Sequence, residues 1–249
     1  FSQSYDFGFN WMASYAYVDS EDVNPMTSSV AFSNYTNVAI MNSENPGTAT
    51  SNYEIPHRFT LRLNYNVELI SGYNTSFTLF GSANQGRPYS FVFNGDPGFG
   101  SSVGFISHNL VYIPTMDDPN VVYGEGFDKA AFDQFVDDMG LERGEIMGRN
   151  SLNSNWWTKF DVRIAQEVPG FMDGHKGEVY LNIENFGNLL NDDWGILEEV
   201  SFPRQQAIVD ADINENGQYV FNEFITPSLS TRVGDVSLWQ VRVGVRYQF

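Results

Sequence analysis

The sequence predicts an all-β chain that forms a segment of an antiparallel transmembrane β-barrel. Three observations predict this fold class: strict alternation of apolar and polar residues, long alternating stretches, and connections of two distinct sizes. Strands of soluble proteins usually have about 5–6 residues, whereas a tilted strand needs about 9–11 residues to cross a bilayer. Two of the alternating stretches exceed 11 residues, and two more have 11.

Residues 57–69 show the alternation most clearly. Every odd position from Phe59 to Leu69 is apolar or aromatic, and every even position from Arg58 to Glu68 is polar. Successive side chains of a strand point to opposite faces, so this strand has one apolar face and one polar face. The five other alternating stretches are residues 7–17, 77–93, 158–164, 178–184 and 239–249.

A soluble β-sandwich also alternates apolar and polar residues, and it is the competing interpretation. The polar face of a sandwich meets water and carries many Lys, Glu and Thr residues. Here the polar positions mix Arg, Asn, Gly and Ser with carboxylates, as the lumen of a barrel would. The lengths of the strands favour the barrel over the sandwich.

Connections of two sizes join the expected strands. Residues 70–75 and 168–177 are short, whereas residues 20–56, 94–155 and 188–238 are long. In outer-membrane barrels the short turns are periplasmic and the long loops are extracellular. We therefore expect the three long segments to be extracellular loops.

The net charge of −18 lies entirely in the three long segments. They contain 23 of the 31 acidic residues and 5 of the 13 basic ones, so the rest of the chain is neutral. The acidic balance excludes nucleic acid as a partner, because phosphate binding needs a basic surface. An acidic vestibule that gathers cations is one interpretation, and a solvated outer surface is the other.

One short helix is expected within the long segments, over residues 127–139. Apolar residues recur every four positions from Phe127 to Met139, and Gly140 follows as a C-terminal stop. The helix would pack on the outer loops.

Charged residues occupy many of the polar strand positions. The basic ones are Arg58, Arg62, Lys159, Arg163, Arg242 and Arg246, and the acidic ones are Glu68, Asp161, Glu178 and Glu184. One interpretation is contact with a plug or a passing substrate, and the other is a set of ion pairs between neighbouring strands. Trp156 and Trp157 lie at an expected rim, where tryptophan is typical of a membrane-interface anchor.

Six segments of the chain carry motifs found together in one family. They are Tyr53–Phe59, Gly86–Ser90, Leu110–Asn120, Arg143–Ser151, Tyr180–Trp194 and Arg246–Phe249. The fifth contains an Asn-Leu-Leu-Asn run, and the sixth ends in an aromatic residue after alternating apolar ones. In this order and spacing they resemble the C-terminal part of a TonB-dependent outer-membrane receptor, most closely the Oar-like group.

The resemblance implies that residues 1–249 form about the last six strands of a 22-stranded barrel, without the plug domain. Six strands cannot close a barrel, and an open edge in lipid would leave N–H and C=O groups unpaired. The implied partners are therefore outer-membrane lipid and the remainder of the barrel and plug, in the same protein or another chain. TonB and the barrel assembly machinery are also implied, the latter through the C-terminal strand that ends at Phe249.

The resemblance implies a receptor in the outer membrane of a Gram-negative bacterium that binds and imports a scarce extracellular ligand. The alternative is a surface structural or interaction protein that uses the barrel as a membrane anchor. No catalytic set is found, because His57, His108 and His175 fall in separate regions and have no ligand-like spacing. We therefore do not expect an enzyme.

Residues 212–223 fit the template of a calcium-binding EF-hand loop. The calcium ligands would be Asp212, Asn214, Asn216, Gln218 (through its backbone carbonyl) and Glu223. The competing prediction is a β-hairpin with a type I′ turn at Asn216-Gly217, between residues 208–213 and 218–224. The low charge of the ligand set favours the hairpin, as does the lack of expected flanking helices.

Overall fold

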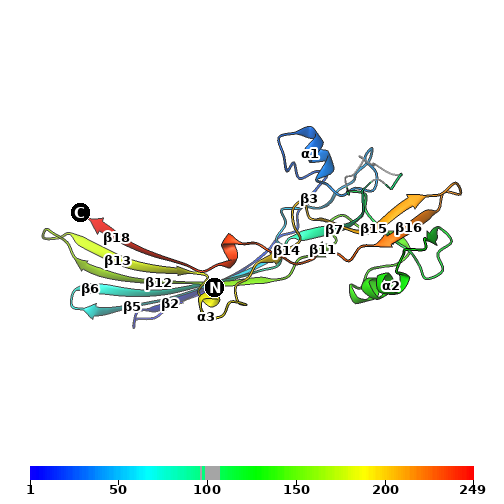
Figure 1. Ribbon diagram of the computed structural model, residues 1–249. Helices are drawn as coiled ribbons and strands as arrows, with labels where there is room; N and C mark the ends of the chain where they lie inside the picture. The colour runs from blue at the N-terminus through cyan, green and yellow to red at the C-terminus, as the bar shows by residue number, and fades with distance from the viewer. Residues whose placement is uncertain (96, 99–106) are drawn as a thin grey trace.

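The computed structural model describes residues 1–95, 97–98 and 107–249. The molecule is elongated and has two regions that lie end to end (Figure 1). One is a large antiparallel sheet, here named the long sheet. The other, here named the loop module, consists of the described residues of 18–56, 85–155 and 197–238.

Seven strands form the long sheet, and their order in the sheet is their order in the chain. They are β1 (Ser2–Ser4), β2 (Phe9–Tyr17), β5 (His57–Ile70), β6 (Tyr73–Asn84), β12 (Trp157–Pro169), β13 (Lys176–Glu184) and β18 (Gln240–Gln248). Every neighbouring pair is antiparallel. The prediction of an all-β chain built on antiparallel sheets is therefore confirmed. Among the described residues the sheet is open, with β1 and β18 at its edges.

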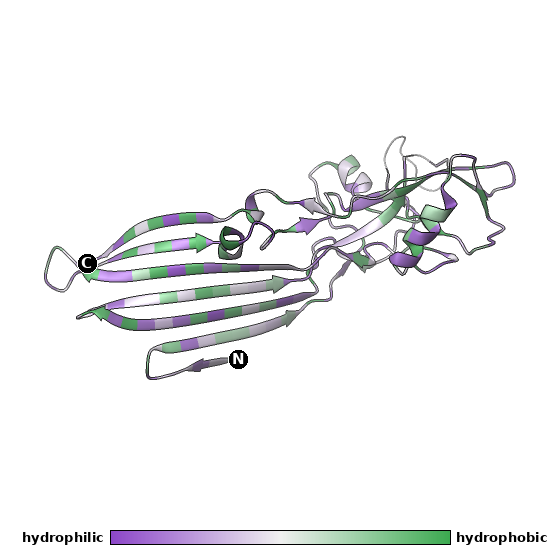
Figure 2. Cartoon of the chain, turned by 60° about the horizontal axis from the view of Figure 1, so that its bottom comes forward, coloured by the Kyte–Doolittle hydropathy of each residue, from purple (hydrophilic) through white to green (hydrophobic). Residues whose placement is uncertain are grey.

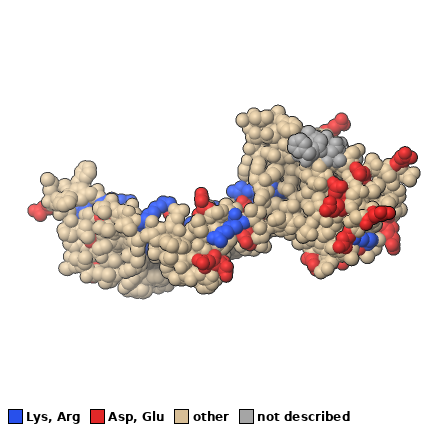
Figure 3. Space-filling view, in the orientation of Figure 1, with Lys and Arg blue, Asp and Glu red and all other residues tan. Residues whose placement is uncertain are grey.

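The register of the long sheet keeps apolar residues beside apolar residues. Leu63 on β5 pairs with Leu79 on β6, which pairs in turn with Val162 on β12. A slip of one residue would turn an apolar set to the polar face, so the alternation specifies the register. Figure 2 shows the resulting bands of hydrophobic and hydrophilic residues along the strands. Lys and Arg side chains lie along the concave side of the sheet (Figure 3), so we name that side the polar face and the other the apolar face.

The predicted strand over residues 77–93 is wrong, because the chain leaves the long sheet within it. Strand β6 ends at Asn84, and β7 (Pro88–Phe93) belongs to a second sheet. Pro88 has no N–H with which to continue the ladder, and a Cβ on Gly86 would overlap the backbone carbonyl of Ser154. All six residues of β7 are buried, so the alternation of exposure also ends there.

The loop module is a folded unit with its own hydrophobic core. Its five-stranded sheet has the order β11-β7-β15-β16-β9, with β7 parallel to β15 and β9 parallel to β16. The further strands are β9 (Val121–Tyr123), β11 (Leu152–Asn153), β15 (Gln205–Ile213) and β16 (Tyr219–Phe224). Three two-stranded sheets complete the module: β3 (Glu21–Asp22) with β4 (Ala49–Thr50), β8 (Tyr112–Ile113) with β10 (Glu145–Ile146), and β14 (Glu198–Glu199) with β17 (Thr231–Arg232). Phe91, Phe132 and Phe221 are fully buried in its core. The last two lie in segments expected as loops, and those segments contain most of the buried apolar side chains.

The helix expected over 127–139 is confirmed as α2 (Lys129–Asp138). The Asp128 side chain caps its N-terminus by accepting a hydrogen bond of 3.0 Å from the Ala131 N–H. Gly140 follows with a φ of 62°, which a residue with a side chain rarely adopts. The remaining helices are α1 (Ala31–Thr36), α3 (Phe186–Leu190) and the 3-10 helix η1 (Asp235–Ser237). Within the described part of the chain, no helix has the length and apolarity needed to cross a membrane.

Arg149, in the long segment 94–155, is hydrogen-bonded to the long segment 20–56. Its guanidinium donates hydrogen bonds to the carbonyls of Val23 (2.8 Å) and Ala49 (3.1 Å) and forms an ion pair of 3.1 Å with Asp22. The Arg149 side chain is only 6% exposed, so these contacts are shielded from water. The loop module is thus held together by a buried cation as well as by its apolar core.

Candidate functional site

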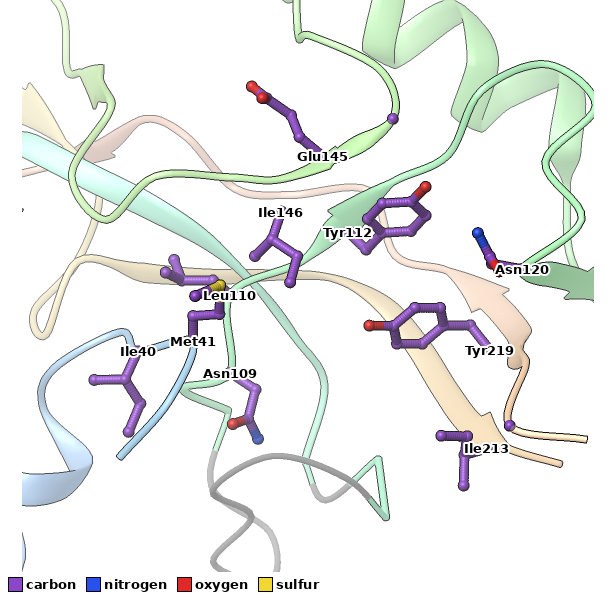
Figure 4. Close-up of a pocket in the computed structure, with 12 residues that line it drawn as sticks. Ile40, Met41, Asn109, Leu110, Tyr112, Asn120, Glu145, Ile146, Ile213 and Tyr219 are labelled. Atoms are coloured by element: carbon purple, nitrogen blue, oxygen red, sulfur yellow. The ribbon is translucent and has the colours of Figure 1, made fainter. Parts of the chain in front are cut away.

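A pocket of about 580 Å³ opens in the loop module between β8, β10 and the β15–β16 hairpin (Figure 4). Its apolar wall includes Ile40, Leu110 and Ile146, and its opposite wall is formed by Tyr112 and Tyr219. Each of the three long segments supplies part of this lining. A concave site with an apolar wall and a few polar groups is the usual form of a small-molecule site.

Three stacked rings form the tyrosine wall of the pocket. The Tyr219 ring lies 5.5 Å from that of Tyr112 and 5.8 Å from that of Phe93, with 17° between the planes in both pairs. The Tyr219 hydroxyl points into the pocket, whereas the Tyr112 hydroxyl points away from it (Figure 4). The stack holds the Tyr219 hydroxyl in place, where it can donate or accept a hydrogen bond.

Asp118 fixes the outer side of this wall. The Tyr112 hydroxyl donates a hydrogen bond of 2.6 Å to Asp118, whose carboxylate also accepts from the N–H of Asn120. The hydrogen bond from Tyr112 is the main reason that the pKa of Asp118 lies below its usual range. Burial, followed by the same hydrogen bond and the charge of Asp118, raises the pKa of Tyr112 to about 12. At neutral pH the pair is therefore a neutral phenol bonded to a carboxylate.

The interior of the pocket has no charged group directed into it in the close-up view. Glu145 is the one charged residue of the lining, and its carboxylate points away from the two tyrosines (Figure 4). A hydrogen bond with Glu142 and the charge of that residue raise the pKa of Glu145. The pocket is thus suited to an uncharged ligand with an apolar side and a few hydrogen-bonding groups.

Residues 212–223, the predicted calcium loop, lie on the β15–β16 hairpin. Asp212 pairs with Val220, and Glu223 pairs with Asp210. The hairpin prediction is therefore confirmed for the backbone, but the predicted type I′ turn is wrong. Asn214 closes a three-residue loop with Gln218, in which Gly217 has a φ of 77° and Asn216 keeps a negative φ. A type I′ turn needs a positive φ at both central residues.

The side chains of two of the predicted calcium ligands, Asp212 and Asn214, accept hydrogen bonds within the hairpin. Asn214 Oδ1 accepts from the N–H groups of Asn216 and Gln218, both at 3.0 Å, and Asp212 accepts 2.8 Å from Asn222. A cation would have to displace these bonds. In the described ranges, no three or more His, Cys, Asp or Glu residues are grouped to hold a metal ion. Calcium binding by Asp212, Asn214, Asn216, Gln218 and Glu223 stays a prediction.

Four of the ten charged residues predicted on the polar face of the long sheet form ion pairs between neighbouring strands. Arg163 lies 2.8 Å from Glu178, and Arg242 lies 3.1 Å from Glu184. The Arg163 guanidinium also lies 4.1 Å from the centre of the Tyr180 ring. These contacts agree with the interpretation of the polar face as an ion-pair lattice.

The three histidines lie far apart, as their spacing predicts. His57 and His175 contact Tyr15 and Tyr247 at opposite ends of the long sheet, at 2.8 and 2.9 Å. His108 is fully buried in the loop module. They therefore do not form a common site.

Sequence reasoning missed the pocket because its walls come from distant parts of the chain. Ile40, Tyr112 and Tyr219 belong to three different long segments, and no local spacing relates them. The signal that was present is the apolar run from Leu110 to Ile113, which is unusual for a solvated loop. That run becomes β8 and the residues that lead into it.

No family model, curated protein or solved structure matches the chain. The resemblance to TonB-dependent outer-membrane receptors therefore stays a prediction from the sequence motifs.

Proposed function

We propose that the chain is part of an outer-membrane receptor of the TonB-dependent kind. The long sheet would lie in the bilayer, and the loop module would meet the extracellular ligand. The observation that carries this proposal is the exposure of the apolar face of the long sheet. Val243 and Val245 are 72% and 74% exposed, although both belong to an unbroken apolar set. A bilayer is a solvent in which such a face is stable.

The distribution of aromatic residues supports this placement. Exposed aromatic side chains gather at both ends of the long sheet. At the end near the loop module they are Tyr15, Tyr17, Trp156, Trp194 and Trp239, and at the far end Phe7, Phe171, Tyr247 and Phe249. Such bands are typical of the two interfaces of a bilayer.

The length of the strands fits the thickness of the membrane. Strand β18 has nine residues and extends roughly 30 Å at about 3.3 Å per residue. A tilt of about 40° reduces this to about 23 Å, close to the apolar band of about 25 Å on outer-membrane barrels. The longer β5 and β12 would extend beyond the bilayer toward the loop module.

The open edges of the long sheet define the partners that the proposal requires. Unpaired N–H and C=O groups at β1 and β18 would cost several kcal/mol each in hydrocarbon. The remaining strands of a barrel would pair with these edges, and a plug would meet the polar face. TonB and the barrel assembly machinery are proposed partners by resemblance, the latter at the strand that ends in Phe249.

A receptor role is favoured over a purely structural anchor by the pocket in the loop module. The hydrogen bonds of Asp118 and the stack around Tyr219 hold the pocket in shape without a ligand. The second candidate is a surface interaction protein, and it is favoured by the separate core of the loop module. A plug with a TonB-binding segment in the full protein would support import, and its absence would support the anchor.

The membrane placement is tested with the full protein in isolated outer membranes. We expect electrophoretic mobility that changes on heating, and protection of the long sheet from added protease. The loop module would be cleaved at its exposed loops in intact cells. A protein that stays in the aqueous phase as a monomer without detergent would contradict the proposal.

A further inference from the structure

The polar face of the long sheet carries a cation that has no counter-charge. Arg62 stands near the middle of β5, and its side chain is exposed. Among the described residues, four ion pairs lie on this face, and they join Lys159 with Asp161, Arg163 with Glu178, Lys176 with Glu167, and Arg242 with Glu184. Within the same ranges, no residue forms a hydrogen bond or ion pair with the Arg62 guanidinium. Its charge is therefore available to a partner.

The nearest side chains on β5 are polar, but they bond to the strands beside them. Thr60 and Asn64 lie on either side of Arg62 along the same face. The hydroxyl of Thr60 shares a hydrogen bond with Ser14, and Asn64 accepts one of 2.7 Å from Thr78. None of these groups is a carboxylate, so the sheet offers no counter-charge beside Arg62.

Two exposed apolar side chains flank Arg62 across the strands. Met12 on β2 pairs with Arg62 on one side, and Phe80 on β6 pairs with it on the other. The register places both on the polar face, where they are 44% and 39% exposed. The inner face of an outer-membrane barrel is polar, whereas Met, Arg and aromatic side chains are enriched in protein interfaces. We name Met12, Arg62 and Phe80 the central patch.

The polar face is hollowed beside the central patch. A cavity of about 250 Å³ lies over β6, β12 and β13, and β6 contributes Thr78 and Phe80 to its lining. A side chain of a partner that covers the central patch would have room there. The patch thus combines a cation, two apolar surfaces and a recess, as an interface does.

The balance of charge indicates the chemistry of the partner. The strands of the long sheet contain seven basic and five acidic residues. The four ion pairs leave three arginines and one glutamate outside them, which are Arg58, Arg62, Arg246 and Glu68. A surface with an excess of arginine is complementary to one that carries carboxylates, and a guanidinium can hold a carboxylate by two hydrogen bonds.

We propose that the polypeptide that fills the lumen of the complete receptor packs on the central patch. One of its carboxylates binds Arg62, and apolar side chains beside this carboxylate contact Met12 and Phe80. The inference rests on the proposed function, in which the polar face lines a barrel and meets a plug. It adds the surface of contact on this chain and the charge of the partner at that surface.

The test turns the expected ion pair into a covalent bond. Arg62→Lys places an amine at the same position, and a water-soluble carbodiimide joins an amine to a carboxylate in contact with it. The two groups lose one water, which the carbodiimide takes up as it becomes a urea. The reaction is run on the full protein in isolated outer membranes, and the joined peptides are identified by mass spectrometry.

We expect an amide between position 62 and an Asp or Glu of the segment that fills the lumen. The sequence of the joined peptide shows whether that segment belongs to the same protein or to another chain. Lys176 and Glu167 provide the internal control, because their charged groups lie 3.1 Å apart and should be joined in the same sample.

Two phenylalanines of β6 test the apolar part of the central patch. Phe80→Ala removes a ring from the patch, whereas Phe77→Ala removes a ring of nearly equal exposure, 38%, from the apolar face. In the Arg62→Lys protein, Phe80→Ala should lower the yield of the amide by about threefold or more, because the partner loses a contact at the centre of the interface. Phe77→Ala should leave the yield unchanged.

Two results would overturn the inference. One is an amine at position 62 that stays free while Lys176 is joined to Glu167, and the other is an amine joined only to acids of residues 1–249. Equal yields from Phe80→Ala and Phe77→Ala would overturn the apolar contact. Heat-modifiable mobility of each variant is measured in parallel. A protein that fails to insert contradicts the proposed function itself, so the two failures are distinguishable.

Discussion

The long sheet and the loop module use the same apolar residue types in opposite ways. In the loop module, Phe91, Phe132 and Phe221 are fully buried against one another. In the long sheet, Val243 and Val245 are more than 70% exposed, and charged side chains pair on the other face. One region buries its apolar residues within itself, and the other presents them to its surroundings.

Charge divides along the same boundary. The strands of the long sheet contain seven basic and five acidic residues, whereas the loop module contains six basic and 21 acidic ones. Figure 3 shows the acidic side chains gathered on the loop module. A region in contact with water tolerates a large net charge, and a region in a bilayer does not. The difference teaches that the long sheet and the loop module differ in charge as well as in burial, as the proposed membrane placement of the long sheet requires.

The largest expected effect is a loss of stability in the loop module when a residue of its core is truncated. Phe221 lies within about 6 Å of the rings of Phe93, Phe127 and Phe132. Phe221→Ala should lower the free energy of unfolding of the loop module by about 3–5 kcal/mol, because it leaves a cavity among these rings. Hydrogen exchange of loop-module amides in the detergent-solubilised protein measures this loss.

The matched change in the long sheet is Val243→Ala, which removes methyl groups from an exposed position. We expect it to alter the stability of either region by less than about 1 kcal/mol. Equal losses from Phe221→Ala and Val243→Ala would show that the two regions do not differ in how they bury apolar residues.

The next effect concerns the boundary between the regions. A Cβ on Gly86 would meet the backbone of Ser154 and lie 2.6 Å from the carbonyl oxygen of Asn155. Because backbone atoms cannot turn aside as a side chain can, Gly86→Ala should destabilise the junction by about 3 kcal/mol. Gly148→Ala is the control, since its Cβ would make one ordinary contact of 3.6 Å. Proteolysis between β6 and β7 should accelerate in Gly86→Ala alone, and equal rates in both variants would refute the close approach.

The long sheet could be predicted from the sequence more completely than the loop module. The alternation over 57–69 locates β5 to within one residue, because a strand with one apolar and one polar face has a period of two. Residues 88–93, which form the buried β7, keep the parity of the preceding strand in Tyr89, Phe91 and Phe93, so the alternation wrongly predicts that they continue it. Its parallel partner β15 lies more than 100 residues away, and no local pattern encodes that pairing. The pocket depends on these distant pairings, which is why its residues could not be grouped from the sequence.

A third effect tests whether the loop module depends on its buried cation. Arg149→Met keeps much of the apolar stem but removes the hydrogen bonds to Val23 and Ala49. It also leaves the Asp22 carboxylate without its partner. We expect the free energy of unfolding of the loop module to fall by about 2–3 kcal/mol. Hydrogen exchange should become faster in β3 and β4 and stay unchanged in the long sheet. Unchanged exchange in β3 and β4 would show that the apolar core alone holds the first long segment.

The smallest expected effect is a dependence of the stability of the loop module on pH. It arises from Asp118 and Tyr112 at the wall of the pocket. The pKa of Asp118 is lowered on folding, chiefly by the hydrogen bond from Tyr112. A group with a depressed pKa stabilises the fold above its unfolded pKa, near 3.9, and this stabilisation is lost as the pH falls through the folded pKa. The pKa of Tyr112 is raised to about 12, so its contribution is complete below about pH 10 and is lost as the pH rises through 12.

Tyr112→Phe isolates this pair, because it removes the hydroxyl and keeps the ring that stacks on Tyr219. We expect it to lower the stability of the loop module by about 1–2 kcal/mol at neutral pH, the range for a hydrogen bond to a charged group. The loss should begin to shrink as the pH falls below about 4, the unfolded pKa of aspartate, and this decrease should be complete only below the lower folded pKa of Asp118, where the carboxylate is protonated. Hydrogen exchange of the segment around Asn120 would report it. A loss that stays constant from pH 3 to pH 7 would mean that the ring packing, and not the bond to Asp118, holds this wall of the pocket.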